Sequence, residues 1–184
     1  MGNSMKIHWF LAACVCLATP ALAQENPPKV AVKTEASAAA TSEEIQWLSY
    51  DKGLARAKSE GKPVVIDFFT SWCGYCKKMD KSTFKDPAVV KFLKENFVTV
   101  RVDGEAKTMV SHEGEQISER SLTKAYGVRG FPTFWFLDSE GKKIGPAPGY
   151  KPTEAFLPLL RYVGGSHYKT MSYENFLKKE TGQG

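Results

Sequence analysis

The sequence predicts an α/β domain with a central β-sheet flanked by helices, an N-terminal extension and a short C-terminal helix. Short runs of Val, Ile, Thr and Phe, which are typical of buried strands, alternate with segments of helical apolar spacing. Such alternation favours a single sheet covered by helices. The chain has 184 residues, of which 42% are hydrophobic and 12% aromatic. This is enough for one domain of ordinary size plus tails.

The first 23 residues have the pattern of a secretory signal peptide. Lys6 provides a positive start, residues 7–18 are apolar, and Ala21-Leu22-Ala23 matches an A-x-A cleavage site. The apolar run is shorter than the roughly 20 residues that a membrane-spanning helix needs. We therefore expect export to the periplasm through a cleavable signal. The alternative is a lipoprotein anchored through Cys14, which follows a sequence that resembles a lipoprotein cleavage box.

Residues 24–43 are rich in Pro, Ala, Ser, Thr, Lys and Glu and lack apolar periodicity, which predicts a flexible linker. We expect the folded domain to cover residues 44–180. Cleavage after Ala23 would leave Cys73 and Cys76 as the only cysteines. Because a disulfide that closes so short a loop stabilises a fold little, this pair is expected to serve reactivity or metal binding.

The first half of the domain contains three expected strands and three expected helices. In chain order these are a short strand (45–50), a helix (51–60), a buried strand (64–69), a helix (77–81), a helix that begins near Pro87, and a strand (97–102). Gly61 and Pro63 end the first helix. Pro87 suits the first turn of a helix, where its missing N–H costs nothing.

The second half begins with residues 105–119, which are polar and charged and are expected to form a surface loop. The elements expected after it are a helix (121–126), a strand (133–137), a short strand (143–144), a helix (153–163) and a last short helix (171–179). Pro158 falls inside the fourth of these elements and could distort it.

The most informative stretch is Cys73-Gly74-Tyr75-Cys76, which lies where a buried strand ends and a helix begins. A helix N-terminus carries a partial positive charge and free N–H groups. Both favour the thiolate, which is the reactive form of cysteine. The placement therefore predicts thiol–disulfide chemistry. A zinc site is the alternative, but structural zinc takes four ligands, and the remaining histidines, His112 and His167, are distant in the sequence.

Three separate segments together resemble the thioredoxin superfamily. They are Trp72 to Lys77 around the cysteines, Asp67 six positions before Cys73, and Gly127-Val128-Arg129-Gly130-Phe131-Pro132-Thr133. The resemblance covers about residues 45–165 and implies the thioredoxin fold, with a central mixed β-sheet flanked by helices. Residues 79–90 are similar to the C-terminal domain of the interchange protein DsbD and to SoxW-type thioredoxins.

The sequence departs from thioredoxin at the residues around the dithiol. Gly74-Tyr75 replaces the Gly-Pro of cytoplasmic thioredoxin and is similar to the active site of the isomerase DsbC. Thr99 stands where thioredoxin has a lysine near its buried acid. The charged 105–119 segment is longer than its counterpart in thioredoxin.

The resemblance implies a catalytic role for three residues. Cys73 would lie exposed at the helix N-terminus and attack a substrate disulfide as a thiolate, and the more buried Cys76 would resolve the mixed disulfide. Asp67 would accept the proton of Cys76. Since its neighbours in the strand are apolar, its carboxyl is expected to have a raised pKa or a partner.

Substrate binding is expected beside the cysteines. The resemblance implies a cis peptide bond before Pro132, with the backbone at Phe131 free to pair with an extended substrate segment. Trp72 and Tyr75 flank Cys73. They either shape an apolar docking surface or, in the case of Trp72, pack against the domain; the sequence leaves both alternatives open.

We therefore expect an exported thiol:disulfide oxidoreductase that acts on protein substrates, in the reducing or interchange direction, supplied by a membrane electron donor. It needs no cofactor beyond the Cys73–Cys76 disulfide, and no metal. The net charge of +5 comes from interleaved basic and acidic residues, which indicates a solvated surface and no nucleic-acid partner. We expect a monomer. The alternatives are a disulfide oxidase or isomerase and a non-enzymatic metal-binding module that uses the same cysteines.

Overall fold

The computed structural model describes residues 44–182. The expected signal peptide, the expected linker and Cys14 lie outside this range. The elements, in chain order, are α1 (Tyr50–Glu60), β1 (Val64–Phe69), α2 (Gly74–Lys81), η1 (Thr83–Lys85), α3 (Pro87–Asn96), β2 (Val98–Asp103), β3 (Met109–His112), β4 (Glu115–Ser118), α4 (Glu119–Ala125), β5 (Thr133–Leu137), β6 (Lys143–Pro148), α5 (Thr153–Gly164), η2 (His167–Lys169) and α6 (Tyr173–Glu180). Within the described range, none of the helices has the length and apolar character needed to cross a membrane.

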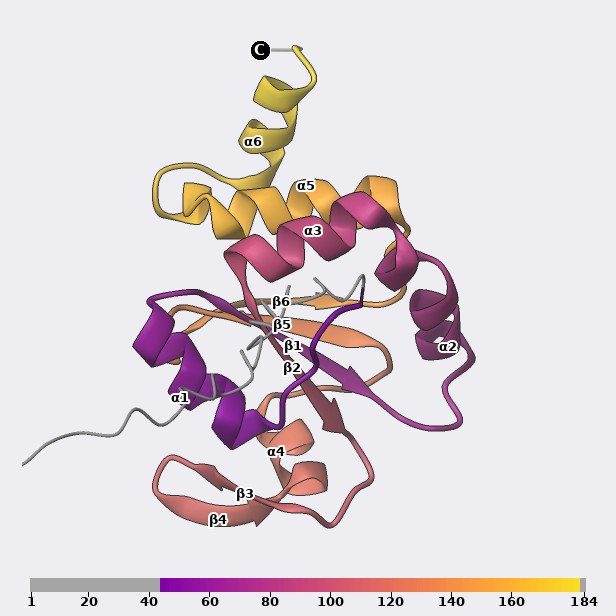
Figure 1. Cartoon of the computed structure of the whole chain (residues 1–184), viewed down its shortest axis with the longest axis vertical. Coiled ribbons are helices and arrows are strands. Elements are labelled where there is room, and N and C mark those ends of the chain that lie inside the picture. Colours follow the sequence, from indigo (N-terminus) through magenta and orange to yellow (C-terminus); the bar gives the residue numbers. More distant parts are fainter. Residues whose placement is uncertain (1–43, 183–184) are drawn as a thin grey trace, which may run out of the picture. The chain divides into compact units, whose positions relative to one another are not determined.

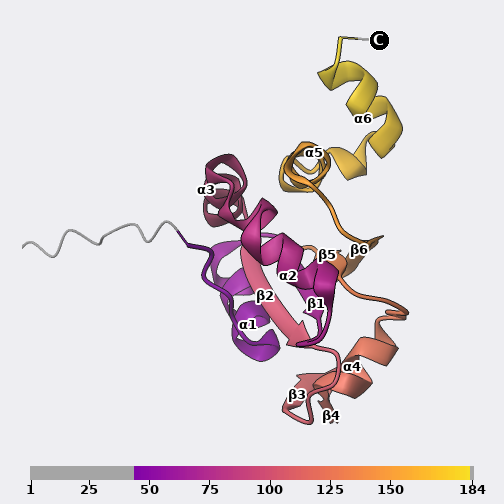
Figure 2. The ribbon, with the colours of Figure 1, turned by 90° about the vertical axis from the view of Figure 1, so that its right-hand side faces the viewer.

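A four-stranded sheet in the order β2-β1-β5-β6 forms the centre of the domain (Figure 1). β1 and β2 run parallel, whereas β5 is antiparallel to both β1 and β6. β3 and β4 form a separate hairpin that lies beside α4 (Figure 2). The expectation of a central mixed sheet flanked by helices is confirmed.

The alternation of side chains along β1 divides the core into two layers. Val64, Ile66 and Phe68 pack with residues of α1 and α4 on one face of the sheet. Val65 faces the other way, into a layer built by α2, α3 and α5. Asp67 shares the face of Val65 because the two positions are two residues apart. The strand therefore carries a carboxyl group into an otherwise apolar layer.

Three of the expected elements differ from the structure. Residues 45–50 do not form a strand, and only Leu48 makes a single parallel bridge, to Val100. The 105–119 segment is not a loop but contains the β3–β4 hairpin, because Val110 is buried against the core and Glu113-Gly114 adopts the two positive φ values of a tight turn. The strand expected at 143–144 continues to Pro148.

The other boundaries follow the sequence signals closely. Pro87 occupies the first turn of α3, and the Asp86 carboxylate caps this helix by accepting hydrogen bonds from the N–H groups of Ala88 and Val89. Pro158 lies inside α5 without ending it. Phe176 of α6 is buried, which confirms the expected last helix.

α1 packs closely against β2 at Gly53. A Cβ atom added there would collide with the Cγ2 atom of Val100. We predict that Gly53→Ala lowers the free energy of unfolding by about 1–3 kcal/mol, although alanine favours a helix. Urea unfolding at neutral pH would measure the change. Gly145→Ala is the control, because an added Cβ there has no neighbour within 4 Å; equal effects of the two changes would contradict this account of the packing.

Candidate active site

The two cysteines form a disulfide across the first turn of α2. Cys73 is the N-cap of this helix, and the Cα atoms of Cys73 and Cys76 are 5.3 Å apart. The backbone N–H of Cys76 donates a hydrogen bond of 3.0 Å to the Cys73 sulfur. A free N–H at the positive end of a helix is thus aimed at Cys73 Sγ. The same N–H would stabilise a thiolate on Cys73 after reduction.

Cys73 is less exposed than expected. Its relative exposure is 4%, against 2% for Cys76. Its sulfur is bonded to that of Cys76. The expectation that Cys73 is exposed is therefore wrong for the disulfide form, whereas Cys76 is the more buried of the two, as expected. Trp72 and Tyr75, in contrast, are each 62% exposed. Two exposed aromatic side chains therefore flank Cys73.

Asp67 is fully buried on β1 with little compensation. Its exposure is 1%, and its Oδ1 atom has no hydrogen-bond partner among the described residues. Oδ2 accepts a hydrogen bond of 3.1 Å from the Arg101 guanidinium. Burial raises the pKa of Asp67 from 3.8 to about 7, although Arg101 acts in the opposite direction. The carboxyl group can therefore take up or release a proton near neutral pH.

Arg101 is the functional residue that sequence reasoning missed. It is the register partner of Asp67 across the parallel β1–β2 pair, and it also donates a hydrogen bond of 2.7 Å to Asp80 of α2. Thr99, at the position of the thioredoxin lysine, instead bonds the backbone of Gln46. The sequence did contain a signal for Arg101. Thr99 and Arg101 are two residues apart in a strand, so their side chains lie on the same face, and Arg101 could have been considered in place of the thioredoxin lysine.

Arg101 links the sheet to the helix that carries the cysteines. Asp80 lies four residues after Cys76, so the two share one face of α2. The guanidinium also lies over the rings of Phe69 and Trp47, with 4.4 Å and 5.2 Å to the ring centroids. These contacts fix the position of the positive charge between the two carboxylates.

The segment before β5 approaches the cysteines through Phe131. The Phe131–Pro132 peptide bond is cis, as the resemblance implies. The Phe131 ring packs edge-on against Trp72, with centroids 6.1 Å apart, and covers Gly104, where an added Cβ would collide with the ring. The Trp72 indole N–H donates to Glu105 at 3.0 Å. Trp72 and Phe131 thus form one surface beside Cys73.

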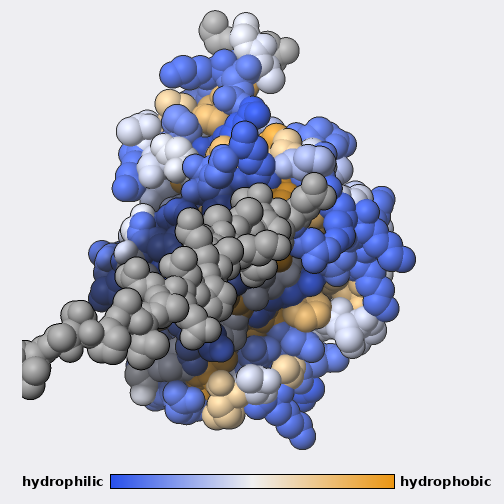
Figure 3. Space-filling model, viewed as in Figure 1, coloured by the Kyte–Doolittle hydropathy of each residue, from blue (hydrophilic) through white to orange (hydrophobic). Residues whose placement is uncertain are grey.

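The other side of the cysteine pair is also aromatic. The rings of Tyr75 and Tyr150 lie 6.0 Å apart, and the Lys78 ammonium lies 4.4 Å from the centre of the Tyr150 ring. Polar side chains otherwise cover most of α2 and α3 on the face shown in Figure 3. Tyr75 and Tyr150 therefore form a second aromatic pair near the disulfide.

The two histidines of the described range lie in other contacts. His112 accepts or donates a hydrogen bond of 3.0 Å with the Tyr50 hydroxyl through its Nδ1 atom, and the His167 ring packs on Phe176. Among residues 44–182, no group of three or more His, Cys, Asp or Glu side chains is arranged to hold a metal ion.

A comparison of this sequence with models of known protein families leads to the same fold. Residues 50–164 match the model of a thioredoxin-like domain. The chain belongs to this thioredoxin-like family. Among solved structures, the thioredoxin-like domain is similar to a thioredoxin from Thermus thermophilus, with a TM-score of 0.55 and 31% identity over 67% of this chain and 92% of that one.

Two curated relatives are larger than this thioredoxin-like protein. The thiol:disulfide interchange protein DsbD of Vibrio vulnificus is 35% identical over 112 residues, which are 60% of this chain but 17% of DsbD. The protein disulfide-isomerase erp38 of Neurospora crassa is 30% identical over 122 residues, 66% of this chain and 25% of that protein. The chain therefore spans about a fifth of the length of these relatives.

We predict that Asp67→Asn stabilises the protein above neutral pH. Folded Asp67 stays protonated up to about pH 7, whereas in the unfolded chain it ionises near 3.8. Between these values the folded state binds more protons, so the stability of the wild type falls as the pH rises. The variant avoids this loss, which is about 4 kcal/mol at pH 8.

Urea unfolding at about pH 4 and pH 8 measures the effect. The difference between Asp67→Asn and wild type should be small in acid and large at pH 8. Asp103→Asn, at a half-buried carboxylate in the same sheet, is the control. A difference that does not depend on pH would contradict the raised pKa.

Proposed function

We propose that the protein is a thiol:disulfide oxidoreductase that exchanges disulfides with protein substrates, in the reducing or interchange direction. The observation that carries the proposal is the Cys73–Cys76 disulfide at the N-terminus of α2, with the Cys76 N–H directed at the Cys73 sulfur. Relatives that are named thiol:disulfide interchange proteins and thioredoxins support the same chemistry.

The reaction starts from the reduced dithiol. The Cys73 thiolate attacks one sulfur of a substrate disulfide, forms a mixed disulfide and releases the other substrate sulfur as a thiolate. Cys76 then attacks Cys73 Sγ, which restores the Cys73–Cys76 disulfide and releases the substrate as a dithiol. Two electrons pass from the protein to the substrate. Asp67, whose pKa lies near 7, accepts the proton that Cys76 loses.

Substrate contacts are assigned to Trp72, Tyr75, Phe131 and Pro132. The two exposed aromatic rings flank Cys73, and Phe131 joins Trp72 to the Pro132 segment. Within the described part of the chain, the N–H groups of Gly130 and Phe131 make no backbone hydrogen bond, so they remain available for an extended polypeptide segment. An aromatic surface of this kind suits partly unfolded or extended substrates.

The direction of electron flow and the location are part of the same proposal. A disulfide reductase in an oxidising compartment must be reduced again after each turnover, so the protein would depend on a membrane electron donor. The proposal also includes export through the signal-like residues 1–23. The reaction needs no cofactor beyond the two cysteines. The relative named protein disulfide-isomerase and the Gly74-Tyr75 pair favour isomerisation as the second candidate.

Serine substitutions test the two cysteine roles separately. In an insulin-reduction assay with dithiothreitol, Cys73→Ser should lose at least about 99% of the activity, because it lacks the attacking thiolate. Cys76→Ser, reduced beforehand and then freed of dithiothreitol, should accumulate a mixed disulfide with insulin that mass spectrometry detects, because it lacks the resolving thiol. Ser71→Ala, at an exposed neighbour, is the control.

Retained activity in Cys73→Ser would contradict the enzymatic role and favour an adaptor. A second measurement addresses metal binding. Alkylation of the two thiols should depend on prior reduction; if added zinc protects them and reductant has no effect, the proposal is wrong.

A further inference from the structure

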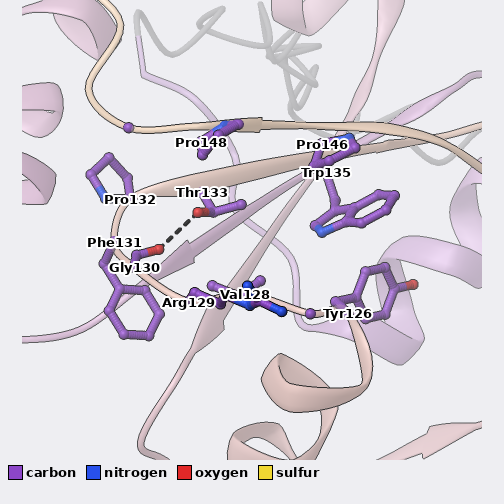
Figure 4. A pocket seen from close by; sticks show the side chains of 12 residues that line it. Tyr126, Val128, Arg129, Gly130, Phe131, Pro132, Thr133, Trp135, Pro146 and Pro148 are labelled. Carbon is purple, nitrogen blue, oxygen red and sulfur yellow. Dashed lines mark hydrogen bonds between the residues drawn. The ribbon is translucent and has the colours of Figure 1, made fainter.

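A groove of about 410 Å³ runs from the Pro132 segment toward the outer strand of the sheet. One wall is the loop that leads to Phe131, and the other is β6 with Pro146 and Pro148 (Figure 4). Tyr126 and Trp135 form its far end, with ring centroids 5.5 Å apart. Tyr126, Trp135, Pro146 and Pro148 have no role in the thiol chemistry described above.

The near end of the groove is continuous with the surface beside the cysteines. Phe131 and Pro132 line the groove, and the same Phe131 ring packs against Trp72, the residue before Cys73. A polypeptide that places its disulfide at Cys73 and extends past Pro132 would enter this groove within a few residues.

The charge of the groove is positive. Arg129 is the only charged residue that lines it, and this exposed side chain makes no ion pair within residues 44–182. Lys143 lies over the Tyr126 ring at 4.3 Å and near the Trp135 ring at 5.7 Å. The nearby Glu140 is paired with Lys58 at 3.7 Å. The groove therefore complements an apolar side chain accompanied by an acidic one.

The outer edge of β6 is poorly suited to binding another strand. Pro146 and Pro148 have no N–H to donate, and prolines at such positions prevent edge-to-edge pairing. The groove offers apolar walls and Arg129 instead, so recognition there depends on side chains.

We propose that this groove binds an aromatic side chain of the substrate polypeptide a few residues from its disulfide, with a neighbouring acidic residue against Arg129. The inference rests on the proposed function and adds its substrate class: polypeptides with an aromatic and acidic segment next to the reactive cysteine.

Four synthetic peptides test the proposal. Each carries one cysteine, blocked as a disulfide with 2-mercaptoethanol, and either Phe or Ala with either Asp or Lys two to four residues away. The rate constant for their reduction by the reduced protein is measured, with 2-hydroxyethyl disulfide as the reference. The peptide with Phe and Asp should react about tenfold faster than the one with Ala and Lys.

Two variants locate this preference in the groove. Arg129→Glu should reverse the preference between Asp and Lys, and Pro146→Asp, at an exposed lining residue, should remove most of the preference for Phe. Arg120→Glu makes the same charge change at an exposed residue outside the groove and should leave both preferences unchanged.

The outcomes separate the two proposals. Equal rates for the four peptides, or preferences that survive Arg129→Glu and Pro146→Asp, would overturn the groove inference alone. Absence of reaction with 2-hydroxyethyl disulfide would overturn the proposed function, and the inference with it. Equal rates for the four peptides, together with a dimer that Pro146→Asp abolishes, would show that a second copy occupies the groove, which also overturns the inference.

Discussion

The arrangement of the active site depends on the burial of one carboxyl group, that of Asp67. The alternation of β1 places it in the apolar layer below α2, where ionisation is costly, and only Arg101 of the neighbouring strand compensates for it. Arg101 in turn binds Asp80 on the helix that carries the cysteines. Burial thus raises the pKa of Asp67, and one guanidinium partly offsets this effect while it ties the sheet to the helix that carries the cysteines.

The surface around the cysteines is built by equally specific contacts. Gly104 leaves room for the Phe131 ring, which supports Trp72, and Glu105 holds the Trp72 indole. β2 and the two residues after it therefore contribute both the partner of the buried acid and the supports of the aromatic surface next to Cys73. The groove beyond Pro132 extends this surface toward Arg129.

Most of the fold was predictable, because strands such as 64–69 and 133–137 are apolar runs between strong turn and cap signals. The β3–β4 hairpin was missed because its strands are short and mostly polar, and Val110 is the only fully buried residue in them. The cysteine pair and Asp67 were found from motif and context. Arg101 was missed because its partner depends on strand register. The groove was missed because it combines two segments, 126–135 and 146–149, which only the pairing of the strands brings together.

The reduction potential of the Cys73/Cys76 pair tests the central claim most directly. The protein would be equilibrated with glutathione buffers and the fraction of disulfide determined by alkylation. A reductase should have a potential close to that of thioredoxin, about −270 mV. A potential near that of the oxidant DsbA, about −120 mV, would contradict the reducing direction, and the absence of any two-electron transition would contradict thiol–disulfide exchange itself.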